Sequence, residues 1–95
     1  MRREKHITID LTNITESKEL QFLLMERLNF PGWYGCNWDA FWDGITGLVQ
    51  MPEVLSLVGW SIMEERLPMD AKLMKECLDE MANQYPDIAP ICQYK

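Results

Sequence analysis

The order of apolar and polar positions along the first 28 residues predicts a strand followed by a helix. Residues 6–11, HITIDL, alternate apolar and polar side chains, as a strand with one buried face does. In residues 18–28, KELQFLLMERL, four leucines recur at helical spacing, and Ser17 before them is a favourable N-cap. We therefore expect a helix that begins after Ser17 and ends before Pro31.

The middle of the chain predicts a second helix and a second strand. The helix begins near Asn37, which is a favourable cap, and runs to about Gly47 or Val49. The stretch EVLSLVGW, residues 53–60, contains a short run that is rich in branched apolar side chains and is bounded by Pro52 and Gly59. Such a run fits a buried strand better than a helix.

The last third of the chain predicts a long helix and a final strand. Residues 68–85, PMDAKLMKECLDEMANQY, carry an apolar stripe at helical spacing, and Pro86 closes the helix. Residues 87–94, DIAPICQY, can form a strand, although Pro90 lacks an N–H and so indicates an edge position or a bulge. Because strands that alternate with helices favour parallel pairing, we expect a small α/β fold.

Length and composition indicate one ordinary globular domain over residues 1–95. The chain is 47% hydrophobic and 25% charged, and no apolar run approaches the roughly 18 residues of a membrane span. Its start, MRREKHITIDL, lacks the apolar segment of a secretory signal. Three widely spaced cysteines without a C-x-x-C pair argue against a disulfide framework and a zinc site. We therefore expect a cytoplasmic protein with reduced cysteines, no cofactor and no membrane partner.

The net charge of -6 is unevenly distributed along the chain. Residues 28–65 contain no Lys, Arg or His, while five Asp and Glu residues fall within the same span. An acidic field of this kind repels nucleic acid and attracts basic proteins. The charge pattern therefore predicts a basic protein as the partner and excludes nucleic acid.

The second predicted helix has an acidic face with no internal counter-charge. Asp39, Asp43, Thr46 and Gly47 share this face, because i, i+4, i+7 and i+8 lie close together on a helix. Two aspartates four residues apart repel each other and cost a few tenths of a kcal/mol. Gly44 adds about 1 kcal/mol relative to Ala inside a helix, so we expect another element or a partner to approach closely there.

The opposite face of this helix is apolar. It carries Trp38, Phe41, Ile45 and Val49, while Trp42 lies on the boundary between the two faces. Aromatic residues at helical spacing are usually part of a core. We therefore expect Trp38 and Phe41 to be buried against the sheet.

The run FPGWYGCNWDAFWDGITG, residues 30–47, resembles the binding segment of the barstar family, intracellular inhibitors of the secreted ribonuclease barnase. The shared pattern is P-x-[aromatic]-Y-G-x-N-[apolar]-D-A-[apolar]-W-D-x-[apolar]-T-G, and it fits without a gap. The spacing stays constant through the last helix to the C-terminus, where Ala71, Glu80, Asp87 and Ile88 also coincide. The resemblance is therefore specific over most of the chain after Leu20.

The resemblance implies a single layer of three parallel strands packed by about four helices, and an inhibitor that plugs an active site in a 1:1 complex. In the family, the second helix and the loop before it occupy the nuclease cleft, with a carboxylate where a substrate phosphate would lie. By register, Asp43 takes that central role and Asp39 the adjacent charged contact. The implied partner-binding residues are Trp33, Asn37, Trp38, Asp39, Trp42, Asp43, Thr46, Gly47 and Glu80.

Several positions near the implied contact surface differ from barstar. Leu48 stands where barstar carries a Trp, Trp33 replaces a Tyr, and Gln84 replaces a second acidic residue of the last helix. Gly44 and Pro86 occupy the places of the barstar cysteines. The expected target is therefore a cognate basic ribonuclease or other toxin, and not necessarily barnase.

Two other classes of function compete with an inhibitor. A small enzyme could use Asp39 and Asp43 as a general acid/base pair or as Mg²⁺ ligands, but the chain has no histidine near them, no Gly-rich phosphate loop and no nucleophile motif. A nucleic-acid-binding module could stack bases on Trp33, Tyr34 and Trp38, but such platforms carry a positively charged groove that this segment lacks. We therefore expect no catalytic residue and no metal site.

Overall fold

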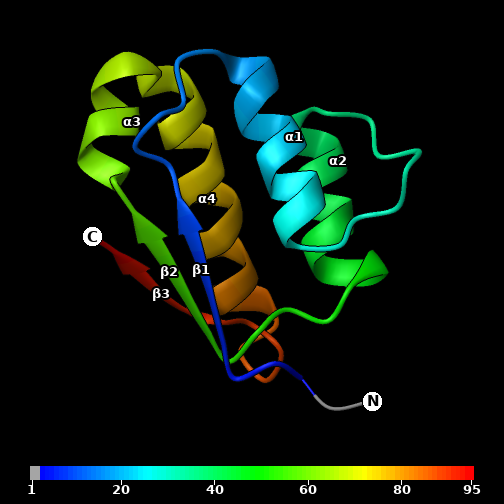
Figure 1. Cartoon of the computed structure of the whole chain (residues 1–95). Coiled ribbons are helices and arrows are strands. Elements are labelled where there is room, and N and C mark those ends of the chain that lie inside the picture. Colours follow the sequence, from blue (N-terminus) through cyan, green and yellow to red (C-terminus); the bar gives the residue numbers. More distant parts are fainter. Residues whose placement is uncertain (1–2) are drawn as a thin grey trace.

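The computed structural model describes residues 3–95 and has strands and helices in alternation along the chain (Figure 1). Within these residues, no helix is both long and apolar enough to cross a membrane. In chain order the elements are β1 (His6–Asp10), α1 (Ser17–Arg27), α2 (Trp38–Asp43), the π-helical turn η1 (Gly44–Leu48), β2 (Val54–Val58), α3 (Trp60–Arg66), α4 (Pro68–Gln84) and β3 (Ile91–Tyr94).

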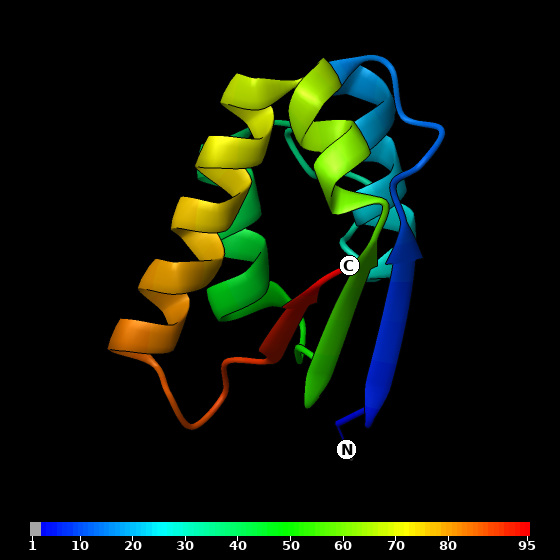
Figure 2. The same ribbon diagram turned by 90° about the vertical axis from the view of Figure 1, so that its left-hand side faces the viewer.

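The three strands form one parallel sheet in the order β1-β2-β3. In register, Ile9 of β1 lies beside Leu57 of β2, which lies beside Tyr94 of β3. The helices α1, α2 and α4 lie on one side of this sheet (Figures 1 and 2). The α/β fold with three parallel strands and four α-helices is therefore confirmed, and β3 is an edge strand that begins directly after Pro90.

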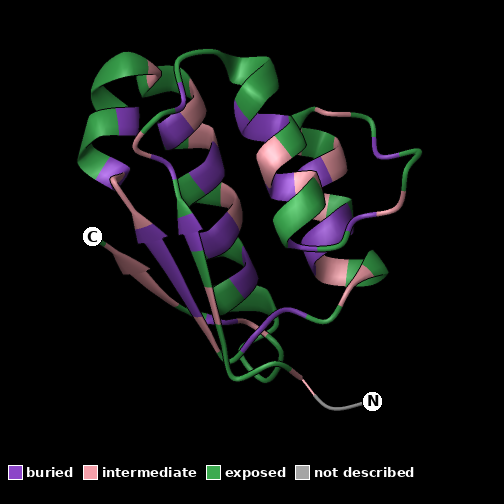
Figure 3. Ribbon diagram, in the orientation of Figure 1, coloured by how far each residue is buried: buried purple, intermediate pink, exposed green. Residues whose placement is uncertain are grey.

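The core lies between the sheet and the helices, and purple residues in Figure 3 mark it along β2 and the inner helix faces. β1 shows the alternation that the sequence predicts, because Ile9 is fully buried while its neighbours Thr8 and Asp10 are exposed. Fully buried side chains come from every layer: Ile9, Leu11, Leu20, Leu24, Phe41, Leu55, Leu57, Met63, Met74 and Met81. Burial of this apolar surface is the main stabilising contribution to the fold.

The start of α1 differs from the sequence prediction, because Glu16 and not Ser17 is the N-cap. The Glu19 side chain turns back and its Oε1 accepts the backbone N–H groups of Thr15 and Glu16, both at 3.1 Å. This is the N3 half of a capping box, in which the N3 carboxylate accepts the backbone N–H of the N-cap residue. Ser17 instead donates its hydroxyl to Asp70 of α4 and so ties the first turns of the two helices together.

The strand predicted between Pro52 and Gly59 is confirmed as β2, but the sequence pattern did not predict α3 after it. The strand ends at Val58, and Gly59 then adopts φ 74°, in the left-handed region that glycine tolerates best. A Cβ at Gly59 would lie 2.4 Å from the Thr12 hydroxyl oxygen, so the turn also requires that there be no side chain at this position. Trp60 is the first residue of α3 and packs against Tyr94.

Candidate functional site

Side-chain hydrogen bonds of Asn37 and Tyr34 fix the loop that leads into α2. Asn37 is the N-cap, as predicted: its Oδ1 accepts the backbone N–H of Ala40 at 2.7 Å, and its amide donates to the Gly35 carbonyl at 3.2 Å. The buried Tyr34 donates its hydroxyl to the buried Gln21 of α1. Burial raises the pKa of Tyr34, so the phenol stays protonated and remains a donor. The start of α2 is therefore held in place before any partner binds.

The apolar face of α2 is buried less uniformly than the sequence predicts. Phe41 is fully buried, as predicted. Trp38 is only partly buried: its ring packs edge-on against Phe41, and its indole Nε1–H donates to Asp70 Oδ1 at 3.0 Å. The expectation that Trp38 is buried against the sheet is therefore wrong, because its ring fixes α2 to the first turn of α4.

Gly44 lies where another part of the same chain comes close, so its helix-breaking cost has an internal reason. A Cβ at Gly44 would lie 2.8 Å from Cε1 of Phe30, whose buried ring stacks beside Tyr34 with centroids 4.8 Å apart. At Gly44 the α-helix changes to the π-helical turn η1, in which the Val49 N–H donates to the Gly44 carbonyl at 3.2 Å. The predicted helix to Val49 thus exists, but its second half has π geometry.

A groove of about 680 Å³ runs between α2 and α4. Carboxylates line it together with aromatic, aliphatic and thiol groups, and none of the described Lys, Arg or His residues lines it. The lining residues are Trp38, Asp39, Trp42, Asp43, Leu73, Glu76, Cys77, Asp79 and Glu80. We call this feature the acidic groove.

Most carboxylates of the acidic groove have no counter-charge. Within residues 3–95, Asp39, Asp43 and Glu76 are exposed and make no ion pair, and the single side-chain ion pair joins Lys75 Nζ to Asp79 Oδ2 at 3.3 Å. Glu80 Oε1 accepts a hydrogen bond from the Gln84 amide at 2.6 Å, which orients its carboxylate without neutralising it. The groove therefore combines several unpaired negative charges with apolar side chains.

The groove brings together five of the residues implied by the resemblance and leaves the others outside. Trp38, Asp39, Trp42, Asp43 and Glu80 line it. Outside it lie Asn37, which caps α2, and Trp33, whose side chain is 73% exposed in the loop before α2. Thr46 and Gly47 line a separate concavity beside the end of α1.

Sequence reasoning missed two carboxylates of the acidic groove, Glu76 and Asp79. Both lie on α4, where Glu76, Asp79 and Glu80 are spaced i, i+3 and i+4 and so share one helix face. That spacing was visible in the sequence. The resemblance placed Glu80 on the same contact surface as Asp39 and Asp43, but helical spacing alone did not indicate that this face of α4 lies beside α2.

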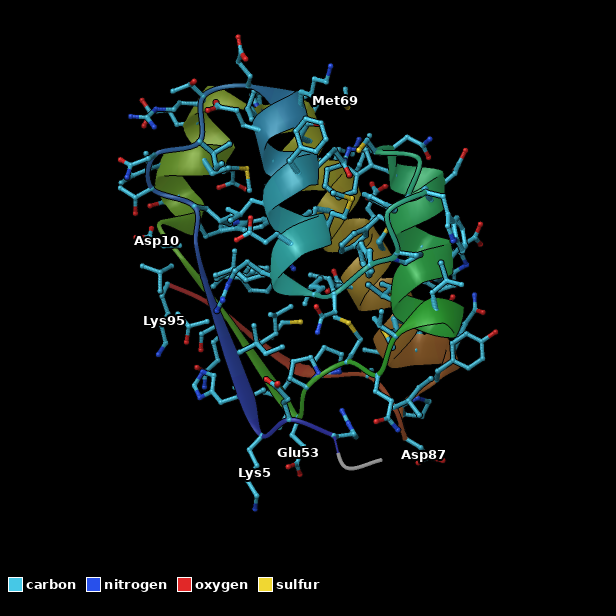
Figure 4. The ribbon with its side chains drawn as sticks, turned by 45° about the vertical axis from the view of Figure 1, so that its right-hand side comes forward. Lys5, Asp10, Glu53, Met69, Asp87 and Lys95 are labelled. Carbon is cyan, nitrogen blue, oxygen red and sulfur yellow. The ribbon has the colours of Figure 1, made fainter. Side chains whose placement is uncertain are left out.

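Among residues 3–95, no Lys, Arg or His lines the groove itself, but basic side chains are not confined to the far side of the molecule. Lys5 and Lys95 lie on the side that carries the sheet (Figure 4), whereas Lys75 of α4 pairs with Asp79 at the groove. In the part of the chain that the structure describes, no three His, Cys, Asp or Glu side chains converge as metal ligands would.

Comparison with known proteins identifies the family of the chain. The family model described as Barstar (barnase inhibitor) matches residues 4–93. A curated protein of Bacillus subtilis (strain 168) that carries the name "Putative ribonuclease inhibitor YrdF" is 31% identical over 83 residues, which cover 87% of this chain and 91% of that protein. The resemblance predicted from residues 30–47 is confirmed by these matches.

Proposed function

Because the chain belongs to the barstar family of barnase inhibitors, we propose that it binds and plugs the basic active site of a cognate secreted ribonuclease or related toxin in a 1:1 complex. The family and the relative named as a ribonuclease inhibitor support a role in ribonuclease inhibition. The proposal adds the mode of inhibition, in which the acidic face of α2 takes the place of substrate phosphates.

The observation that carries this proposal is the set of unpaired carboxylates in the acidic groove. A ribonuclease must hold the phosphates of RNA with Arg and Lys side chains, and carboxylates bind the same groups through charge-assisted hydrogen bonds. Asp39 and Asp43 are exposed, lie one helical turn apart and have no internal counter-charge to release before binding. Complementary potentials of this kind raise both the encounter rate and the specificity of a complex.

The remaining residues have defined places in this proposal. Asp43 occupies the central phosphate position, Asp39 binds beside it, and Glu80 provides a more distant contact from α4. Trp33 contacts the partner from the loop before α2, while Thr46 contacts it from the end of the contact helix. The fixed loop and the cap at Asn37 reduce the entropy lost on binding, because α2 is already ordered.

The proposal predicts stoichiometric inhibition of RNA hydrolysis. The tagged chain is used to capture basic proteins from the culture medium of its source organism, with barnase as a parallel probe, and each captured protein is assayed on RNA. We expect one molar equivalent of the chain to abolish hydrolysis by its partner, and Asp43→Asn to restore hydrolysis at the same concentration. Captured proteins that never cleave RNA, or that cleave it equally fast in the presence of excess chain, would refute the proposal.

A further inference from the structure

Tyr85 adds a second aromatic ring beside Trp42, which lines the acidic groove. Its side chain is 44% exposed, and its ring centroid lies 6.4 Å from that of Trp42, with the two planes tilted by 42°. Trp42 lines the groove between Asp39 and Asp43 in sequence. The two rings therefore form one aromatic surface, which we call the aromatic shelf, at an edge of the acidic groove.

The backbone holds Tyr85 in a fixed place. Its N–H donates to the Met81 carbonyl at 2.8 Å, and its carbonyl accepts the N–H groups of Ile88 at 3.1 Å and Ala89 at 3.0 Å. Tyr85 caps α4 with φ −132°, a conformation that the following Pro86 favours because a proline disfavours helical geometry in the residue before it. An exposed ring on a backbone anchored in this way loses little freedom when a partner covers it.

The surroundings of the shelf restrict what can bind there. Asp43 and Glu80 line the same groove as Trp42, and Gln84, one residue before Tyr85, orients Glu80. An aliphatic partner side chain would cover the rings but would remove water from these carboxylates without pairing them. A guanidinium group has a flat face that stacks on an aromatic ring and an edge that donates to carboxylates, whereas an ammonium group is a strongly hydrated point charge.

We propose that the aromatic shelf selects an arginine side chain of the partner, and that Tyr85 is a specificity-determining residue of the interface. The arginine stacks its guanidinium on the rings of Tyr85 and Trp42 and directs its N–H groups toward the groove carboxylates. This inference rests on the proposed function for the identity of the partner. The binding chemistry of the shelf can be tested separately from that function.

The test uses small probes of stated charge and shape. N-acetyl-arginine amide, N-acetyl-lysine amide and N-acetyl-leucine amide are titrated into the protein at low salt, and the indole N–H signal of Trp42 is followed by NMR. Tyr85→Ala and Tyr85→Phe have the same net charge as the natural chain, so a difference between them reports the ring alone. Ile91→Ala, which removes a 67% exposed apolar side chain on the edge strand, is the matched control.

We expect saturable binding of the arginine probe that is tighter than binding of the lysine or leucine probe. Tyr85→Ala should weaken it by about threefold, within the range of a single exposed cation–π contact, while Tyr85→Phe and Ile91→Ala leave it unchanged. Equal binding of arginine and lysine, stronger binding of leucine, or no effect of Tyr85→Ala would overturn the proposal. The same variants are then measured against the inhibited ribonuclease.

The two proposals fail in different ways. If the natural chain inhibits a ribonuclease but the arginine probe does not select the shelf, the function holds and the inference about Tyr85 is wrong. If the arginine probe binds in a Tyr85-dependent manner but no ribonuclease is inhibited, the shelf holds and the proposed function is wrong.

Discussion

Asp39 and Asp43 repel each other on an exposed helix face, and neither has an internal partner that would offset the cost. Their mutual repulsion opposes folding by a few tenths of a kcal/mol, and only Asp39, in the first turn of α2, gains from the helix dipole. We expect the two carboxylates to stabilise the complex instead, where they pair with cationic groups of the partner that are shielded from water. At the scale of single residues, substitutions at these two positions should therefore weaken partner binding without lowering the stability of the fold.

Replacing Asp43 by Asn should leave the melting temperature unchanged or raise it slightly, because a repulsive charge is removed. The affinity for the ribonuclease should fall by at least about 2 kcal/mol, the threshold of a binding hot spot, for which a barstar aspartate is itself a known example. Calorimetry of unfolding and of binding measures both effects. Glu53→Gln, which removes one exposed charge outside the acidic groove, should change neither by a comparable amount.

Phe41 and Trp38 should differ in their contribution to stability. Phe41 is fully buried, so Phe41→Ala should lower the free energy of unfolding by about 3 to 5 kcal/mol, comparable to the whole stability of a small domain. Trp38 is partly exposed, and its truncation should cost less while it also leaves Asp70 without its indole donor. Urea denaturation measures the two values. A Phe41→Ala variant as stable as the natural chain would contradict the burial of this face.

The thiol of Cys92 should react slowly in the folded protein. Burial is the main cause that raises the pKa of Cys92 to about 11, so very little thiolate is present at pH 8. We expect iodoacetamide to modify Cys92 at least about tenfold more slowly in the folded chain than in urea, since the thiolate is the nucleophile. Peptide mass spectrometry follows the reaction. Equal rates in the two states would show that the thiol is accessible and ionises normally.

At the scale of elements, the α-helical geometry of α2 ends at Asp43, and η1 continues the helix from Gly44 to Leu48. Gly44 gives room to the Phe30 ring, and Gly47, three residues later, has open space where a Cβ would be added. The Thr46 hydroxyl donates to the Trp42 carbonyl at 2.6 Å across the boundary between α2 and η1. Packing within the protein therefore requires glycine at position 44 but not at position 47.

Alanine at these two glycines should have opposite effects on stability. Gly44→Ala should destabilise the protein by about 1 to 3 kcal/mol, because the buried Phe30 ring must shift from its neighbours. Gly47→Ala, the matched control, should stabilise it by up to about 1 kcal/mol, because it lowers the backbone entropy lost on folding without a clash. Thermal unfolding of the pair checks this. Destabilisation by both, or by neither, would contradict the packing at Phe30.

The elements that the sequence predicted are those with a strong period or an unambiguous terminator. The alternation in residues 6–11 and the leucine spacing of α1 reflect a single buried face, and prolines 86 and 90 bound the last helix and strand. The sequence did not reveal α3, because its first residue continues the apolar run of β2 and its cap is a left-handed Gly59 without a polar side chain. The N-cap at Ser17 was wrong because Glu16 and Glu19 form a capping box one residue earlier, while the Ser17 hydroxyl donates to Asp70.

Five of the nine residues that line the acidic groove were predicted from the sequence. The acidic face of α2 follows from helical spacing within one segment, so Asp39 and Asp43 were found together. Glu76 and Tyr85 were missed because their importance depends on α4 packing beside α2, a long-range arrangement that spacing within one helix cannot give. The geometry of η1 was missed for a similar reason, since it depends on the packing of Gly44 against Phe30.

At the scale of the whole molecule, five carboxylates from α2 and α4 gather in one groove. Within the described chain, the acidic groove has no basic lining residue, and of its five carboxylates only Asp79 makes an ion pair. With a net charge of -6, the molecule therefore carries a cluster of negative charge where the partner is proposed to bind. Such a cluster should attract a basic partner before contact.

The most direct test of this account is stopped-flow association with the inhibited ribonuclease across a salt series. We predict an on-rate far above the ~10⁵ to 10⁶ M⁻¹s⁻¹ of unsteered pairs at low salt. It should fall steeply as the Debye length shortens toward ~8 Å, while the off-rate changes less. Asp43→Asn should flatten this dependence more than Glu53→Gln. An on-rate that stays constant with salt, or that Asp43→Asn and Glu53→Gln change equally, would contradict charge mimicry by the acidic groove.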